Sequence, residues 1–102
     1  MVTYSLIEVI NMMHLSINVS GLVQGVGFRY SVLRVALEMG VVGTVKNEMD
    51  GSVSIEAQAD ERVLHIFLSK MKASPAPFGR VDNMDYNFSN DLKSYKKFTV
   101  IG

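Results

Sequence analysis

The sequence predicts an α+β fold, a split βαβ sandwich in which two helices cover one face of an antiparallel sheet of four to five strands. Two stretches place apolar residues at helical spacing, and several shorter segments alternate apolar with polar residues. A glycine-rich turn and an Asp-Gly pair separate some of these segments. The 102 residues have room for one domain with one core.

The first strand and first helix are joined by glycines. Residues 15–20 alternate apolar with polar side chains, which is typical of a strand with one buried face, and Gly21 is expected to end it. Three glycines fall within Gly21–Gly27. Residues 28–39 then carry apolar side chains at helical spacing, and Gly40 follows as a helix stop. This part of the chain is therefore predicted as strand, glycine-rich turn and helix.

The next two strands are predicted over residues 41–46 and residues 53–58. Between them lies Asp50-Gly51, a strong hairpin-turn signal, so these strands should pair antiparallel.

The second helix is expected to begin after Asp60, a plausible N-cap, and Pro75 and Pro77 close the region. Its apolar stripe consists of Val63, Leu64, Phe67, Leu68 and Met71. A fourth strand is predicted over residues 84–88, a loop over residues 90–94, and a short last strand around Phe98 and Val100. This order of elements is that of ferredoxin-like folds.

Composition excludes several kinds of site. Ten basic and ten acidic residues cancel, so the surplus of positive charge that favours nucleic-acid binding is missing, and we expect no nucleic-acid partner. Without cysteine there can be no disulfide, thiolate nucleophile or cysteine zinc site. With two histidines far apart in sequence, we expect no metal site and no cofactor.

Residues 1–13 are rather apolar but lack the basic segment of a secretory signal and contain Glu8. They are also shorter than the about 20 apolar residues that span a membrane. We expect them to be an N-terminal extension to a domain of residues 14–102, and the protein to be a soluble, cytoplasmic monomer without membrane contact.

The glycine-rich turn carries the most informative residues. Unpaired N–H groups and the helix dipole at a helix start favour a tetrahedral oxyanion, and glycines let the backbone approach it closely. Arg29 opposes the dipole in the first helical turn, but it is well placed to grip a phosphate. Taken alone, the turn leaves a second interpretation open, in which Gly25 and Gly27 only shape the chain and Arg29 only solvates the helix end. The turn matches neither the P-loop nor the dinucleotide-binding pattern.

Two segments resemble the signatures of the acylphosphatase family. The first is Gly21-Leu22-Val23-Gln24-Gly25-Val26-Gly27-Phe28-Arg29, and the second runs from Gly43 to Val53 with Asn47 inside it. Thr44 departs from the aromatic residue usual in the family, and Ala59 from a closing glycine. We expect both departures to affect packing more than chemistry. The similarity extends from about residue 14 to residue 102.

The resemblance implies a metal-free hydrolase that splits the carboxyl–phosphate bond of small-molecule acyl phosphates without a covalent intermediate. It implies that Arg29 and the backbone amides of the preceding residues bind the phosphate, and that Asn47 orients the attacking water. The residues that supply these amides are Gln24, Gly25, Val26, Gly27 and Phe28. Without the first signature, Asn47 would be interpreted as a turn residue beside Asp50-Gly51.

Two other functions compete with this one. Acylphosphatase-like domains also occur within larger maturation proteins that handle carbamoyl phosphate, so the alternative is a non-catalytic module that binds acyl or carbamoyl phosphate. A regulatory or nucleic-acid-binding domain of the same fold is less favoured, because it would need a basic sheet face with exposed aromatic side chains.

Overall fold

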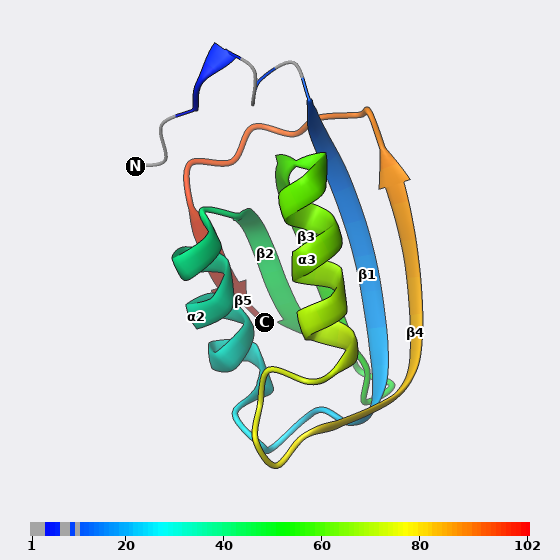
Figure 1. Ribbon diagram of the computed structural model, residues 1–102. Helices are drawn as coiled ribbons and strands as arrows, with labels where there is room; N and C mark the ends of the chain where they lie inside the picture. Colours follow the sequence, from blue (N-terminus) through cyan, green and yellow to red (C-terminus); the bar gives the residue numbers. More distant parts are fainter. Residues whose placement is uncertain (1–3, 7–8, 10) are drawn as a thin grey trace.

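The computed structural model describes residues 4–6, 9 and 11–102, and its elements follow the predicted order (Figure 1). They are β1 (Met12–Leu22), α2 (Phe28–Met39), β2 (Val42–Asn47), β3 (Val53–Asp60), α3 (Glu61–Lys72), β4 (Arg80–Ser89) and β5 (Phe98–Ile101). Both helices lie on one face of the sheet (Figure 1). The predicted fold class is confirmed.

The sheet has five strands in the order β4-β1-β3-β2-β5. The pairs β1–β3, β1–β4 and β2–β3 are antiparallel, but β5 pairs parallel with β2. The sheet is therefore mixed, whereas the sequence predicted an antiparallel one. The segment after β4 crosses over the end of the sheet where β1 begins, so β5 runs back in the direction of β2 (Figure 1).

Element boundaries agree with the predictions to within about two residues except in β1 and β4, and β4 begins at Arg80, four residues before the strand predicted over residues 84–88. Gly21 does not end this strand, which continues to Leu22 across a register shift between Ser20 and Gly21. Gly40 ends α2, and Asp60 caps α3 by accepting a hydrogen bond from the backbone N–H of Arg62 at 2.9 Å, as predicted. The hairpin between β2 and β3 is also confirmed.

The core lies between the sheet and the two helices, and it anchors the glycine-rich turn and the end of β2. Val23 and Phe28, at the two ends of the glycine-rich turn, are each 1% exposed. Val45, two residues before Asn47 on the same face of β2, is fully buried. Burying such side chains stabilises the fold by about 1.5–3 kcal/mol each. The turn and the end of β2 are therefore both anchored in one core.

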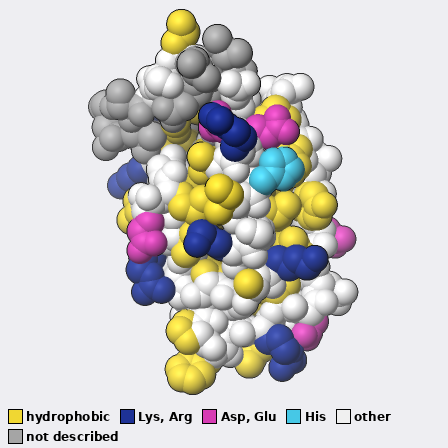
Figure 2. All heavy atoms as spheres, viewed as in Figure 1, with side chains coloured by type: hydrophobic (Ala, Val, Ile, Leu, Met, Phe, Trp, Pro, Cys, Tyr) yellow, Lys and Arg dark blue, Asp and Glu magenta, His cyan; other side chains and the backbone are white. Residues whose placement is uncertain are grey.

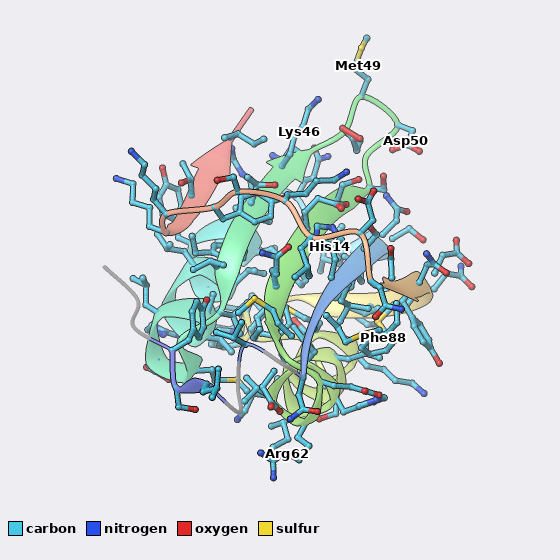
Figure 3. All side chains as sticks on the ribbon, turned by 90° about the horizontal axis from the view of Figure 1, so that it is seen from above. His14, Lys46, Met49, Asp50, Arg62 and Phe88 are labelled. Atoms are coloured by element: carbon cyan, nitrogen blue, oxygen red, sulfur yellow. The ribbon has the colours of Figure 1, made fainter. Side chains whose placement is uncertain are left out.

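The open face of the sheet carries a polar network around His14. Figure 3 shows His14 on the side of the sheet away from α3. Its Nε2 lies 2.6 Å from Oε1 of Glu56. Gln58 donates to the backbone oxygen of Lys93 at 2.8 Å and accepts from its N–H at 2.9 Å, which fastens the segment after β4 over this face.

The N-terminal residues enter the sheet at Met12, where β1 begins. Residues 1–3, 7–8 and 10 of the predicted extension lie outside the described residues, so the domain boundary stays a prediction. Within residues 4–6, 9 and 11–102, no helix has the length and apolar character needed to cross a membrane. On the helix-covered face, charges of both signs are interspersed with hydrophobic side chains (Figure 2).

Candidate functional site

The turn between β1 and α2 curls because two of its glycines adopt left-handed backbone conformations. Gly25 has a φ of 78° and Gly27, which directly precedes α2, a φ of 75°. For other L-residues this conformation costs roughly 1–2 kcal/mol. The two glycines therefore let the chain turn sharply into the helix and leave its N–H groups open.

The N–H groups of the turn are unpaired. Across residues 11–102, no backbone N–H from Gln24 to Tyr30 donates to a protein acceptor, and the first such bond runs from Ser31 to the oxygen of Gly27 at 3.1 Å. The first turn of α2 holds no acidic residue, and no side chain caps it. The positive end of the helix dipole is thus uncompensated, which is the environment that binds anions at helix starts.

Arg29 adds a full positive charge at this point. Its Nη1 donates to the backbone oxygen of Gly102 at 3.0 Å. Within the described part of the chain, it forms no ion pair with an Asp or Glu side chain. A guanidinium has five N–H donors, so most of the donors of Arg29 remain available to a ligand.

Asn47 is the last residue of β2, and its Oδ1 is buried without a hydrogen-bond partner in the described part of the chain. Leaving a buried acceptor unsatisfied costs about 1–3 kcal/mol. Such an orphaned acceptor is stabilised when a hydrogen-bond donor reaches it.

These groups meet in one pocket of about 210 Å³. Its walls are Val23, Gln24, Gly25, Gly27, Phe28, Arg29, Tyr30 and Asn47. The structure thus brings together every residue predicted for the site except Val26, whose side chain packs against the core and whose N–H is nevertheless unpaired. Phe28 is buried, so only its backbone can face a ligand.

A larger hollow of about 290 Å³ lies on the open face of the sheet, but its chemistry does not suit a phosphate. Glu56 and Asp85 contribute negative charge to its walls. Several of its polar groups are already hydrogen-bonded: the hydroxyl of Ser16 donates to Glu56 at 2.7 Å, and Asn18 donates to Ser54 at 3.1 Å. The smaller pocket is therefore the better candidate.

Gln24 was predicted to contribute its backbone N–H alone, and its side chain has other partners. Its side-chain Nε2 donates to the backbone oxygens of Glu48 and Ser52, each at 2.9 Å, and is not free for a phosphate. Its contribution to anion binding is limited to its backbone N–H. The side chain instead connects the turn to the hairpin that follows Asn47.

That hairpin is fixed by Asp50. The hydroxyl and the backbone N–H of Ser52 donate to Oδ1 of Asp50 at 2.6 and 2.9 Å. These bonds lower the pKa of the Asp50 carboxyl from its ordinary value of 3.8. Figure 3 shows Met49 and Asp50 at the tip of the hairpin, projecting away from the helices.

The sequence analysis missed Tyr30, which lines the pocket while 63% of its surface is exposed. Its position directly after Arg29 in the first turn of α2 was the signal that could have indicated it. In the described part of the chain, no group of three or more His, Cys, Asp or Glu side chains is arranged to hold a metal ion.

The chain is similar to several known proteins. A family model described as Acylphosphatase matches residues 15–100. An acylphosphatase of Lactobacillus gasseri is 48% identical over 86 residues, 84% of this chain and 94% of that protein. The crystal structure of acylphosphatase from Bacillus subtilis is similar with a TM-score of 0.85 at 36% identity, covering 88% of this chain and 99% of that one. Full-length HypF in its phosphate- and nucleotide-bound form has a TM-score of 0.81 at 30% identity, but only 12% of its chain is covered, against 89% of this one.

Proposed function

The chain belongs to the acylphosphatase family, and we propose that it carries out the reaction of this family in the pocket that joins Arg29 to Asn47. The reaction is the hydrolysis of the carboxyl–phosphate bond of an acyl phosphate to a carboxylate and inorganic phosphate. One observation carries the assignment of the site: Asn47, whose Oδ1 is buried without a hydrogen-bond partner in the described part of the chain, lines the same pocket as Arg29 and the turn.

In this proposal, the phosphoryl oxygens are bound by the unpaired N–H groups of Gln24–Phe28 and by the guanidinium of Arg29. Hydrogen bonds to a charged group contribute about 1.5–3 kcal/mol each. Fixed donors around the equatorial oxygens stabilise the charge of the transition state without reorganising during the reaction. The turn therefore serves both to bind the substrate and to lower the barrier.

Asn47 places the nucleophile. Its Oδ1 accepts a hydrogen bond from a water molecule and directs the water oxygen at phosphorus. The new bond forms from water to phosphorus as the bond from phosphorus to the acyl oxygen breaks, and the carboxylate leaves with the electron pair. Because a carboxamide cannot accept the proton as a base, the proton of the water passes to a phosphoryl oxygen of the substrate. A carboxylate is a weakly basic leaving group, so no general acid is required.

The assignment is tested by measuring hydrolysis of acetyl phosphate or benzoyl phosphate by the wild type, Arg29→Ala and Asn47→Ala. Arg34→Ala is the matched control, since Arg34 is an exposed arginine of the same helix that does not line the pocket. We expect Arg29→Ala to lose both phosphate affinity and turnover, and the control to keep both. Wild-type hydrolysis by Arg29→Ala would refute the assignment.

The site of attack is tested separately in ¹⁸O-labelled water. Attack on phosphorus puts the label into inorganic phosphate, whereas attack on the acyl carbon puts it into the carboxylate. Label found in the carboxylate would contradict the role proposed for Asn47.

A non-catalytic phosphate-binding module is the second candidate, because a HypF chain contains a domain with this fold. The same pocket would serve it. Turnover separates the two candidates. A binding module would leave both acetyl phosphate and carbamoyl phosphate intact, whereas an enzyme would hydrolyse at least one of them.

We further propose that a small acyl phosphate is the only partner the reaction needs, and that the protein is a monomer of the cytoplasm with its working domain in residues 14–102. Size-exclusion chromatography with light scattering tests the monomer. Removal of residues 1–10, which leaves β1 whole, tests whether the upstream residues are dispensable, since the shortened chain should hydrolyse acetyl phosphate as the full chain does.

A further inference from the structure

Gln24 connects the turn before α2 to the hairpin after β2. Its Nε2 donates to the backbone oxygens of Glu48 and Ser52 at 2.9 Å each, and the two protons of this nitrogen match the two acceptors. Within residues 11–102, no other hydrogen bond joins residues 23–29 to residues 47–53. One side chain thus accounts for the polar connection between the two halves of the pocket.

The hairpin end of this connection is rigid. The N–H of Glu48 donates to the oxygen of Ser52 at 2.8 Å, and the N–H of Gly51 donates to the oxygen of Glu48 at 3.2 Å. The hydroxyl of Ser52 also donates to Oδ1 of Asp50 at 2.6 Å and accepts from Nδ2 of Asn18 at 3.0 Å. Glu48 directly follows Asn47, so any movement of the hairpin relative to the turn would move Asn47 relative to the phosphate site.

We propose that Gln24 is a positioning residue, which sets the distance between the phosphate-binding turn and the water held by Asn47. This inference rests on the proposed function. In-line attack requires reacting atoms at about 3–3.5 Å, and a displacement of about 1 Å can cost 10²-fold in rate. The two reacting partners are bound by different elements, so their spacing depends on what joins those elements, and Gln24 joins them.

The geometry argues against a direct role for the Gln24 side chain on the phosphate. Both of its donors are engaged, and its remaining oxygen is an acceptor, which would repel phosphoryl oxygens. Gln24 therefore acts through Asn47, and its loss should affect turnover without an equal effect on phosphate binding.

The experiment replaces Gln24 with methionine, which preserves the length of the side chain but removes both hydrogen bonds. The matched control is Gln58→Met. Gln58 also exchanges two hydrogen bonds with the backbone, at Lys93, but does not line the pocket. The constants kcat and KM for acetyl phosphate, and the inhibition constant for inorganic phosphate, are measured for both variants alone and with Asn47→Ala.

We expect Gln24→Met to lower kcat by about tenfold to a hundredfold and to leave the inhibition constant for phosphate close to that of the wild type. Gln58→Met should lower the melting temperature but not kcat. In the Asn47→Ala background, Gln24→Met should cause no further loss of kcat, because the water it helps to position is no longer held.

Unchanged kcat in Gln24→Met, or an equal loss of kcat with and without Asn47, would overturn the proposal. Wild-type turnover by Asn47→Ala alone would instead refute the proposed function, so the two failures are distinguishable. If Gln24→Met does not fold by circular dichroism, Gln24→Asn replaces it. Asparagine keeps the amide but is one methylene too short to reach both oxygens, and the same loss of kcat is expected.

Discussion

Nη1 of Arg29 donates to the backbone oxygen of Gly102 at 3.0 Å, and the parallel pairing of β5 with β2 places this oxygen beside the end of β2. Lys46 pairs with Ile101 in these parallel strands. Asn47 and Gly102, the next residue of each chain segment, therefore lie at the same end of the pair. The residue after the last strand thus supplies an acceptor that holds the Arg29 side chain, and both Arg29 and Asn47 line the pocket.

Arg29→Lys should weaken phosphate binding although it preserves the charge. A lysine ammonium cannot reach Gly102 and also present a planar pair of donors to the phosphate. Loss of one charge-assisted hydrogen bond predicts about 1.5–3 kcal/mol of lost binding free energy. The inhibition constant for inorganic phosphate measures this loss of binding free energy. An unchanged constant in Arg29→Lys would show that the planar pair of guanidinium donors is unimportant.

Inorganic phosphate should stabilise the folded protein, because it binds a site that the unfolded chain lacks. At a concentration of 100 times the dissociation constant, the expected gain is about 2.7 kcal/mol. Differential scanning calorimetry should detect it in the wild type and in Asn47→Ala, but not in Arg29→Ala. A phosphate-dependent shift of the same size in Arg29→Ala would place the anion elsewhere.

Gly27→Ala should destabilise the fold by roughly 1–2 kcal/mol, because alanine must adopt a left-handed conformation there. No atom lies within 4 Å of the added methyl group, so the cost falls on the backbone alone, and the turn should shift to relieve it. Phosphate affinity should fall as well. Gly40→Ala is the control: its φ is 70°, its surroundings are equally open, and it lies at the other end of α2. It should lose similar stability and keep full phosphate affinity.

Asp50 should make the stability of the hairpin depend on pH. The hydroxyl and N–H of Ser52 hold the pKa of the folded carboxyl below 3.8, its value in the unfolded chain. The stabilisation is therefore present at neutral pH and is lost as pH falls from about 3.8 through the lowered pKa of the folded state. Asp50→Asn should be less stable than the wild type at pH 7, and this difference should disappear in acid. A difference that persists unchanged at pH 2 would exclude the carboxyl as its source.

Local patterns were sufficient for much of the fold. The periodicities of residues 28–39 and 53–58, the stop at Gly40 and the turn at Asp50-Gly51 depend on neighbours in sequence, and the structure confirms them. The direction of β5 could not be predicted in the same way. Its parallel pairing with β2 depends on the path of the chain after β4, which no local pattern encodes.

The pocket also combines features that local sequence patterns indicate with contacts that they do not. The turn and Asn47 carry sequence signals, and the structure brings them to one pocket. The side-chain bonds of Gln24 and the buried contact of His14 with Glu56 join residues far apart in sequence. Such contacts follow from packing, so a single sequence offered no signal for them.

The most direct test of the division of roles in the pocket is a paired measurement on Asn47→Ala: kcat for benzoyl phosphate, and the dissociation constant of inorganic phosphate by calorimetry. Loss of the water acceptor should reduce kcat by about 10²-fold, while the turn and Arg29 keep phosphate affinity near that of the wild type. Turnover at the wild-type rate, or loss of phosphate binding to the same degree as turnover, would contradict the account.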